Sequence, residues 1–558
     1  MRKLIKILAY VVGFAALLLF VVFAYIRWGL APQIPEVANK ASLALKRETL
    51  AANHYRIGNN WLRKNDYGIW EEYVEGEAFE RGVITGKLNK ELLYLQEEYF
   101  VAQVDELVSS KSYLTFLAFV TRIFNRELDE HFPEENKLEI YGESFSAPDE
   151  FNYIAPAYDR MLNYHAAHDI GHALQSLALV GCTSFGAWGN RTQDSSLLIG
   201  RNLDFSLGDK FAEDKIVYFC KPDAGHRFAI VTWGGFMGCV SGMNEKGLTV
   251  TINAAKSDVP TKATTPIAII ARQILQYASN IDEAFAIAKK YQSFVCETIM
   301  VGSAADGTTA LIEKSVAKTV LLLPDSNLII CANHYQSDSF KNDKDNIENI
   351  ATSSSMYRYN RMNELIGNSL TLTPAQAANI LRSQKGLGEK NIGMGNEKAM
   401  NQLISHHAVI FQPDKRLMWV SANPYQLGAF VCYDLNKVFA QASGSTASKS
   451  LAEADLVIPQ DSFLRSDDWK KFQQFKALRK QIKQAVKNKE PLQNEAVFIQ
   501  QFEACNPEFW ETHYWIGKYY GMKGNATLSA AAYKKALTKE IHDTREKENI
   551  DKLLAAKK

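Results

Sequence analysis

Cys182 lies in a short run, Gly181–Ser184, whose residue types suit nucleophilic chemistry. Eighteen residues after it begins the run Gly-Arg-Asn-Leu-Asp-Phe, which contains Arg201 and Asp204. A lone cysteine is usually no more than a small buried hydrophobe. An arginine and an aspartate on a buried strand beside that cysteine are costly unless they have a purpose. The combination therefore indicates a reactive site built around the thiol.

These segments resemble a known family of enzymes. Cys-Thr-Ser followed by Gly-Arg-Asn-Leu-Asp-aromatic looks like the start of the mature catalytic chain in acid ceramidase and N-acylethanolamine acid amidase. Gly-Cys-Thr is also similar to the cleavage site of the acyl-coenzyme A:isopenicillin N acyltransferase family, and choloylglycine (bile salt) hydrolases are a further branch. The resemblance covers roughly residues 180 to 435, where four separate segments match in order.

The resemblance implies an N-terminal-nucleophile (Ntn) hydrolase of the α+β class, folded as a four-layer αββα sandwich and using neither a cofactor nor a metal. The chain would be cut between Gly181 and Cys182, which makes Cys182 the catalytic nucleophile. Arg201 matches the arginine that steadies the thiol in its anionic form, and Asp204 matches the aspartate that holds the freed amino group.

Later segments extend the same resemblance. Gly242–Leu248 resembles a bile salt hydrolase stretch that leads to an asparagine, here Asn253. The run Cys-Ala-Asn-His resembles the segment whose asparagine, here Asn333, helps to form the oxyanion hole. Ser-Ser-Met-Tyr-Arg resembles a stretch with a second catalytic arginine, here Arg358.

The implied chemistry is coherent. The Cys182 thiol attacks the carbonyl of Gly181, where glycine leaves the carbonyl open and tolerates strained backbone angles. The freed α-amino group, with an ordinary pKa near 8, then acts as general base, so no histidine partner is needed. The same thiol attacks an N-acyl amide, of a fatty-acyl or bile-acid type, and forms an acyl-enzyme. Water resolves it in a hydrolase, and an amine resolves it in an acyltransferase.

The first residues of the chain predict a membrane anchor. The stretch 7–26 carries no charge over about 20 residues, roughly 30 Å as a helix, which matches a bilayer core. We interpret residues 1–28 as an uncleaved signal anchor. Basic residues before the apolar stretch place the N-terminus in the cytoplasm, so residues 28–558 are expected on the periplasmic or extracellular side of a single-pass membrane protein.

The hydrophobic pattern divides the remaining chain. Residues 29–181 are expected to be a helical pre-segment, because 92–107 and 113–128 carry apolar residues at helical spacing. After Cys182, short β-branched and aromatic runs alternate with turns and two amphipathic helices. This pattern predicts a catalytic domain over residues 182–440.

The C-terminal part is predicted to be helical. Residues 441–450 are small and polar and form a linker to residues 451–558. Positions between Ile516 and Ala536 fall at the offsets of one tetratricopeptide (TPR) unit. A TPR-like tail would offer a protein contact. The alternative is a helical hairpin docked on the main domain, because one unit cannot bury its own apolar face.

Composition limits the other possibilities. The net charge of +1 implies no attraction to nucleic acid. The seven cysteines are odd in number and include no CxxC pair, which argues against a disulfide framework or a zinc site. His165, His168 and His172 lie on one helix face in a loose relative of a zinc motif. We favour core or surface histidines there, since no third ligand is evident.

A function of a different class is a membrane-anchored, catalytically inert interaction protein with a TPR-like binding tail. The retained Cys182, Arg201 and Asp204 argue against it. Mass analysis separates the two, because an inert scaffold stays in one piece.

Overall fold

The computed structural model describes residues 31–107, 120–173, 181–205, 208–367, 371–444 and 450–556, together with Gly13, Phe14 and Leu17. The expected membrane helix of residues 7–26 lies almost entirely outside this part of the chain. Among the residues described, no helix is both long enough and apolar enough to cross a bilayer.

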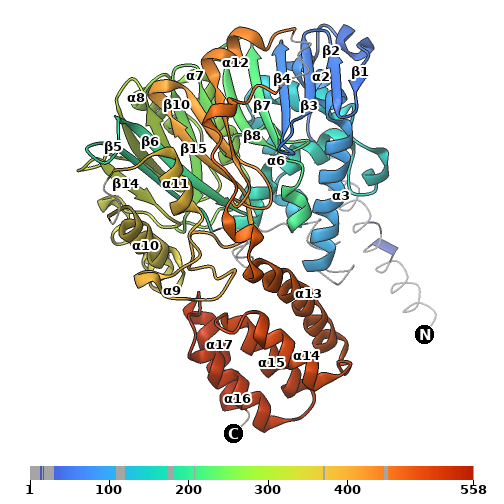
Figure 1. Ribbon diagram of the computed structural model, residues 1–558. Coiled ribbons are helices and arrows are strands. Elements are labelled where there is room, and N and C mark those ends of the chain that lie inside the picture. Colours follow the sequence, from blue (N-terminus) through green and yellow to red (C-terminus); the bar gives the residue numbers. More distant parts are fainter. Residues whose placement is uncertain are drawn as a thin grey trace, which may run out of the picture.

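Two β-sheets form the centre of the molecule (Figure 1). The larger has eleven strands in the order β1 (Glu48–Ala51), β2 (His54–Ile57), β3 (Asn60–Lys64), β4 (Trp70–Gly76), β7 (Ile216–Pro222), β8 (Phe228–Thr232), β9 (Ser241–Asn244), β10 (Leu248–Ala254), β11 (Glu297–Ser303), β12 (Thr308–Lys314) and β13 (Thr319–Leu322). The smaller has six, in the order β14 (Leu328–Cys331), β5 (Thr183–Gly189), β6 (Ser195–Asp204), β15 (Ser405–Gln412), β16 (Leu417–Ser421) and β17 (Phe430–Asp434).

The sheets pack face to face, because both present buried apolar residues to one shared core. That core joins Val217 and Phe219 of the larger sheet to Ile199 and Val409 of the smaller one. Strand positions that face a common core alternate with positions that face the covering helices. The mixed α+β architecture expected from the sequence is confirmed.

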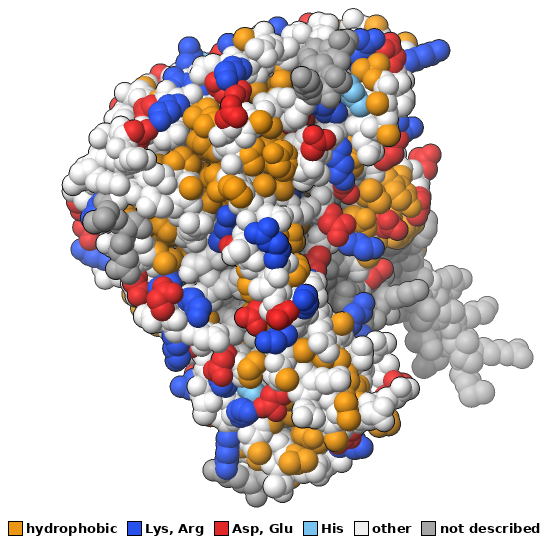
Figure 2. Space-filling view, viewed as in Figure 1, with side chains coloured by type: hydrophobic (Ala, Val, Ile, Leu, Met, Phe, Trp, Pro, Cys, Tyr) orange, Lys and Arg blue, Asp and Glu red, His pale blue; other side chains and the backbone are white. Residues whose placement is uncertain are grey.

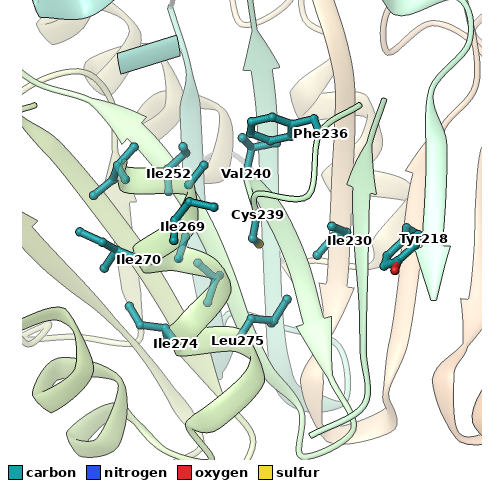
Figure 3. Close-up of a cluster of buried hydrophobic side chains, with 14 of the residues drawn as sticks. Tyr218, Ile230, Phe236, Cys239, Val240, Ile252, Ile269, Ile270, Ile274 and Leu275 are labelled. Carbon is teal, nitrogen blue, oxygen red and sulfur yellow. The ribbon is translucent and has the colours of Figure 1, made fainter. Parts of the chain in front are cut away.

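Helices cover the outer faces of the two sheets. Helix α7 (Ile267–Tyr277) and helix α8 (Ile281–Lys290) lie on the larger sheet, and the isoleucines of α7 pack over the strands carrying Ile230 and Ile252 (Figure 3). Helix α8 begins at Asn280, whose side chain accepts the N–H of Glu283 as an N-cap. Helices α7 and α8 are the two amphipathic helices expected after Cys182.

The outer face of the smaller sheet is covered by helices that follow β14. They are α10 (Ser355–Gly367) and α11 (Pro374–Leu381), with α9 (Lys344–Thr352) beside α10. Helix α12 (Leu435–Gln441), after β17, instead packs Val438 and Phe439 into the core between the two sheets. Thr373 and Gln376 form a reciprocal capping box at the start of α11.

The pre-segment corrects one expectation, because it is not all helical. Residues 48–76 form β1 to β4, which extend the larger sheet, and β4 pairs in parallel with β7 over seven residue pairs. The segment holds short aromatic and β-branched runs separated by turns with glycine at positive φ, at Gly58 and Gly68. A period-2 pattern in these short runs is easily missed beside the long helices that follow.

Among the described residues of the pre-segment, the longer helices include α2 (Ala78–Leu88), α3 (Lys90–Leu107), α5 (Glu134–Ser144) and α6 (Ala157–Ala173). Helices α2 and α5 cross closely, since a Cβ added to Gly82 would lie 1.9 Å from the carbonyl oxygen of Glu139. Helix α3 matches the expected helix of residues 92–107, whereas part of the expected helix of residues 113–128 lies outside the described residues.

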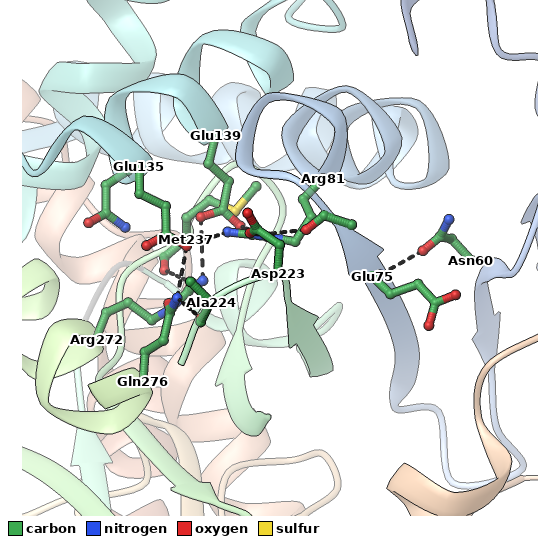
Figure 4. Close-up of polar contacts among 12 residues, drawn as sticks. Asn60, Glu75, Arg81, Glu135, Glu139, Asp223, Ala224, Met237, Arg272 and Gln276 are labelled. Carbon is green, nitrogen blue, oxygen red and sulfur yellow. Dashed lines mark hydrogen bonds and ion pairs between the residues drawn. The ribbon is translucent and has the colours of Figure 1, made fainter. Parts of the chain in front are cut away.

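Buried ion pairs join the pre-segment to the catalytic domain (Figure 4). Arg81 of α2 contacts Glu139 of α5 at 3.4 Å and Asp223, after β7, at 2.9 Å. Glu139 also contacts Arg272 of α7 at 3.4 Å. Removing one partner from such a buried set leaves an uncompensated charge, so these contacts hold the two parts together firmly.

The last hundred residues form five helices with their own apolar core (Figure 1). They are α13 (Asp467–Asn488), α14 (Glu495–Cys505), α15 (Trp510–Met522), α16 (Ala526–Leu537) and α17 (Thr544–Ala555). Phe475 and Phe502 stack at 5.0 Å in this core, which also takes in Leu403 and Leu427 of the catalytic domain. The helices are therefore docked on the main domain, and a TPR-type partner contact stays a prediction.

The surface carries charges of both signs. On the face shown in Figure 2, Lys and Arg side chains alternate with Asp and Glu side chains and do not gather into one large patch. This distribution agrees with the net charge of +1.

Candidate active site

Cys182 directly precedes β5 and is 1 % exposed. Strand β5 pairs with β6 in a register that places Ser184 opposite Arg201 and Thr183 opposite Asn202. The backbone N–H of Gly181 donates to the carbonyl of Asp204 at 3.0 Å. Antiparallel pairing thus brings the start of β5 beside the end of β6, and with it the cysteine beside the arginine and the aspartate.

Arg201 is fully buried and contacts the thiol directly. Its Nη2 atom lies 3.6 Å from the Sγ atom of Cys182 and donates to the carbonyl of Ile252 at 2.7 Å. Its Nη1 atom donates to Ser241 Oγ at 2.6 Å. Two fixed hydrogen bonds therefore aim the guanidinium at the sulfur.

The pKa of the Cys182 thiol is raised in this uncleaved chain. Burial is the main cause, because it penalises the thiolate. The Arg201 guanidinium lowers the pKa, while the carboxyls of Asp204 and Glu297 raise it. Arg201 acts in the expected direction, but burial outweighs it.

Asp204 is buried at the end of β6, and burial raises its pKa to about 7. The Ser405 hydroxyl and the guanidiniums of Arg358 and Arg201 oppose this shift. Its Oδ2 atom accepts the side-chain N–H of Gln402 at 3.1 Å, and its Oδ1 atom has no hydrogen-bond partner among the described residues. A carboxyl titrating near neutral pH beside a thiol is suited to exchanging a proton with it.

Arg358, in the first turns of α10, contacts the backbone of Cys182. Its Nη1 atom donates to the carbonyl of Cys182 at 2.7 Å and to Thr183 Oγ1 at 2.6 Å. Its Nη2 atom donates to Asn333 Oδ1 at 2.6 Å. A residue 176 positions away in the chain thus fixes the backbone of the cysteine.

The two asparagines lie in the same site. Asn253 Nδ2 is 3.3 Å from the carbonyl of Cys331 and 3.2 Å from that of Ala332, and Ser184 Oγ donates to its Oδ1 atom at 3.0 Å. Asn333 Nδ2 donates to the carbonyl of Ala254 at 2.9 Å. The structure therefore brings all six expected catalytic residues together, and the oxyanion role of the two asparagines stays a prediction.

Gln402 and His407 also belong to the site, and neither was predicted from the sequence. Gln402 contacts both Gly181 and Asp204, and His407 Nε2 lies 2.9 Å from the same Ser241 Oγ that accepts from Arg201. Burial lowers the pKa of His407 well below its usual value, so the imidazole is neutral. No motif or periodicity marks these residues, because each reaches the site through tertiary packing alone.

The histidine motif before the cysteine has a structural role at its first member. His165 Nδ1 lies 2.8 Å from the carbonyl of Met161, and its Nε2 atom accepts the N–H of Met237 at 2.8 Å. Burial lowers the pKa of His165 to about 4. Both ring nitrogens are thus occupied, and the side chains of His168 and His172 lie outside the described set. Within that set, no group of three or more His, Cys, Asp or Glu side chains is arranged to hold a metal.

Comparison with known proteins assigns the central part of the chain. Residues 190–423 match the family model of acyl-coenzyme A:6-aminopenicillanic acid acyl-transferase. Five of the six expected catalytic residues lie inside this range, and Cys182 lies just before it.

Two curated relatives match at low identity. Protein dcd1B of Dictyostelium discoideum is 26% identical over 273 residues, which cover 47% of this chain and 52% of that protein. An uncharacterized protein of Archaeoglobus fulgidus is 27% identical over 183 residues, covering 28% of this chain and 30% of that protein. The chain thus spans about half of the first relative and less of the second.

Two solved structures are similar in part. A Caenorhabditis elegans ortholog of N-acylethanolamine-hydrolyzing acid amidase has a TM-score of 0.30 and 13% identity, covering 42% of this chain and 93% of that chain. A conjugated bile acid hydrolase from Clostridium perfringens also has a TM-score of 0.30 and 13% identity, covering 46% and 93%. The family match is confined to residues 190–423, so this central part of the chain is similar to that acyl-transferase family.

Proposed function

We propose that the chain is a cysteine amidase that activates itself by cutting the Gly181–Cys182 bond and then hydrolyses linear amide bonds of N-acyl compounds. The observation that carries the proposal is the contact of 3.6 Å between Arg201 Nη2 and Cys182 Sγ, beside a buried Asp204 whose pKa is raised to about 7. A structural cysteine does not need a buried charge of each sign at its sulfur.

Self-cleavage and turnover need different bases. Before cleavage, the α-nitrogen of Cys182 is part of a peptide bond and cannot accept a proton. Asp204 is suited to take the thiol proton at that stage, because its raised pKa keeps it close to neutral pH. After cleavage, the freed α-amine becomes the base, and the unpartnered Oδ1 atom of Asp204 is an acceptor that can orient it.

The substrate class is proposed from a cavity, one of whose lining residues, Phe205, directly follows Asp204 in the chain. An apolar cavity lies between α3 and α6 of the pre-segment and the loops after β6 and β8. Its walls include Phe100, Tyr164, Phe205, Phe211 and Trp233. Such a lining favours an apolar acyl group, of the fatty-acyl or bile-acid type, over a charged one.

Acyl transfer is the second candidate, because the matching family model is that of an acyl-transferase. The two functions share the acyl-enzyme and differ only in whether water or an amine takes the acyl group. An inert interaction protein is the outcome to be excluded.

A single experiment separates these possibilities. Purified wild-type protein is analysed by mass spectrometry and then incubated with a panel of N-acyl amides, with and without an added amine. We expect two chains, the larger beginning at Cys182, and release of free acid. Transfer product in the presence of the amine would favour the acyltransferase, and an intact, inactive wild type would favour the scaffold. Cys182→Ala is the control that should stay in one piece.

We also propose that residues 7–26 anchor the protein in the membrane with its catalytic body on the non-cytoplasmic side. The support is the uncharged apolar stretch and the basic residues before it. Protease added to intact spheroplasts should digest the catalytic body, whereas full protection would show the reverse orientation.

A further inference from the structure

The peptide unit of Gly181 is held at both of its polar atoms. Its N–H donates to the carbonyl of Asp204 at 3.0 Å, and its carbonyl accepts the side-chain N–H of Gln402 at 2.8 Å. This carbonyl belongs to the bond that the proposed function requires to be cut. A hydrogen bond to a carbonyl oxygen polarises it toward attack at the carbon.

Gln402 reaches this carbonyl from a loop before β15 and is only 3 % exposed. Its Nε2 atom also donates to Asp204 Oδ2 at 3.1 Å. One amide nitrogen therefore joins the scissile carbonyl to the carboxyl that is suited to take the thiol proton. A Cβ at position 181 would lie 2.8 Å from this nitrogen, so a larger residue there would push the Gln402 amide away from its present position.

The asparagines expected in the oxyanion hole are engaged elsewhere in the uncleaved chain. Asn253 Nδ2 faces the carbonyls of Cys331 and Ala332, and Asn333 Nδ2 donates to that of Ala254. Within the described residues, Gln402 is the side chain with a hydrogen bond to the Gly181 carbonyl oxygen.

The loop holds Gln402 in place before any reaction starts. Asn202 of β6 donates to the carbonyl of Met400 at 2.8 Å, and the N–H of Leu403 donates to Asn401 Oδ1 at 2.9 Å. Leu403 adopts a positive φ of 53° and packs into the core of the C-terminal helices. A donor fixed in advance in a water-poor site costs no reorganisation when charge develops on the oxygen.

We propose that Gln402 is a catalytic residue of the self-cleavage step, donating to the oxyanion that forms on Gly181. This inference rests on the proposed function. The Cys182 sulfur bonds to the Gly181 carbonyl carbon while its proton passes to Asp204, and the carbonyl electron pair moves onto the oxygen beside Gln402. The oxyanion then collapses, the C–N bond breaks, and the α-nitrogen takes the proton. Water hydrolyses the thioester, which frees the Gly181 carboxylate and the thiol.

The test compares two buried glutamines in the full-length protein. Gln402→Met keeps the size of the side chain but removes the donor. Gln426→Met is the matched control, because Gln426 is equally buried and donates to a carbonyl outside the site, that of Leu381 at 3.2 Å. Cleavage is followed by pulse-labelling and chase on denaturing gels. We expect Gln402→Met to cleave about 10²- to 10³-fold more slowly, the usual loss of one oxyanion donor, and Gln426→Met to cleave like wild type.

Gln402→Glu supplies a readout that a purely structural role would not move. Its carboxyl keeps the shape of the glutamine, repels the oxyanion when ionised and donates when protonated. We expect its cleavage rate, relative to wild type, to rise as the pH falls. If Gln402→Met melts at a low temperature, the pH dependence of the Gln402→Glu cleavage rate decides the role of Gln402 instead.

The outcomes separate this inference from the proposed function. If wild type cleaves and Gln402→Met cleaves at the same rate, only the role of Gln402 is overturned. The same conclusion follows if the cleavage rate of Gln402→Glu equals that of wild type at every pH. Wild type that never cleaves between Gly181 and Cys182 overturns both proposals.

Discussion

The guanidinium of Arg201 lies against the sulfur of Cys182, with 3.6 Å between Nη2 and Sγ. Burial raises the pKa of this thiol and Arg201 lowers it, so the arginine offsets part of the cost of forming a thiolate in a buried site. Such a contact decides how readily the nucleophile ionises.

Arg201→Ala should therefore raise the pH at which Cys182 reacts with iodoacetamide, by about 1 to 3 pH units. To bypass self-cleavage, residues 1–181 and residues 182–558 are co-expressed, with the initiator methionine removed so that Cys182 is N-terminal. Labelling rate is measured against pH, and Cys182→Ala supplies the background from the other thiols. Arg382→Ala, which removes a buried arginine away from the sulfur, is the control. An unchanged pH profile in Arg201→Ala would show that the contact has no electrostatic role.

Asp204 should lower the stability of the protein at neutral pH. Burial raises its pKa from an ordinary value of 3.8 to about 7, so ionising the carboxyl costs free energy in the folded chain. The free energy of unfolding should fall as the pH rises from about 4 to about 7, by up to about 4 kcal/mol for this group alone at roughly 1.4 kcal/mol per pKa unit. Above pH 7 its contribution is constant.

Asp204→Asn removes this cost because the amide cannot ionise. In a Cys182→Ala background, which keeps both proteins uncleaved, the Asn variant should match its parent near pH 4 and be more stable at pH 8. Urea unfolding at four pH values measures the difference. A variant that is less stable than its parent at pH 8 would mean that the carboxylate is held by structural ion pairs with the nearby arginines.

The pre-segment should stay bound after cleavage. It contributes β1 to β4 to the larger sheet, and the buried Glu139 contacts Arg81 and Arg272 on either side of the junction. The two chains should co-elute on native gel filtration and separate only in denaturant. Arg272→Met should lower the urea concentration at which they separate, because losing one partner of a buried pair costs about 3–5 kcal/mol.

Lys470→Met is the control for that experiment. Lys470 forms an exposed ion pair with Asp467, with side chains 75% and 84% exposed, and such pairs contribute little. Equal effects of the two substitutions would argue that the buried ion pairs do not hold the chains together.

The C-terminal helices should assist self-cleavage, because they support the loop that carries Gln402. Asn506 accepts the N–H of Met394 at 3.0 Å and donates to its carbonyl at 2.8 Å, and Gly393 packs directly on Phe509. Asn506→Ala should slow cleavage several-fold by loosening the loop.

Asn525→Ala tests whether that effect is specific. It removes the N-cap of α16, a loss of about 1 kcal/mol in the same helical region but away from the loop. Pulse-chase gels compare the cleavage rates of both variants. Equal slowing would point to general destabilisation, and no slowing in Asn506→Ala would remove the proposed support.

Much of the catalytic domain could be predicted from local patterns. Short β-branched runs, turns and amphipathic helices predict the fold class. Their hydrophobic periodicity reflects which face of each strand or helix is buried. The resemblance, and not the periodicity, implied that Arg201 and Asp204 lie beside the cysteine. The strands of residues 48–76 could not be predicted from local patterns. Short runs beside long helices are ambiguous until a partner strand, here β7, pairs with them.

Through a resemblance to a known family, the sequence by itself singled out Cys182 as the proposed nucleophile, together with its neighbouring glycine and the charged residues that follow, since these lie in short runs with recognisable residue types. Only the tertiary structure decided that Gln402, 221 residues from Gly181, meets the carbonyl of Gly181, and that Arg358 meets the backbone of Cys182. The physical reason is that a hydrogen bond between distant segments leaves no periodicity in either of them. It arises where the start of β5, the end of β6, helix α10 and the loop before β15 meet around Cys182.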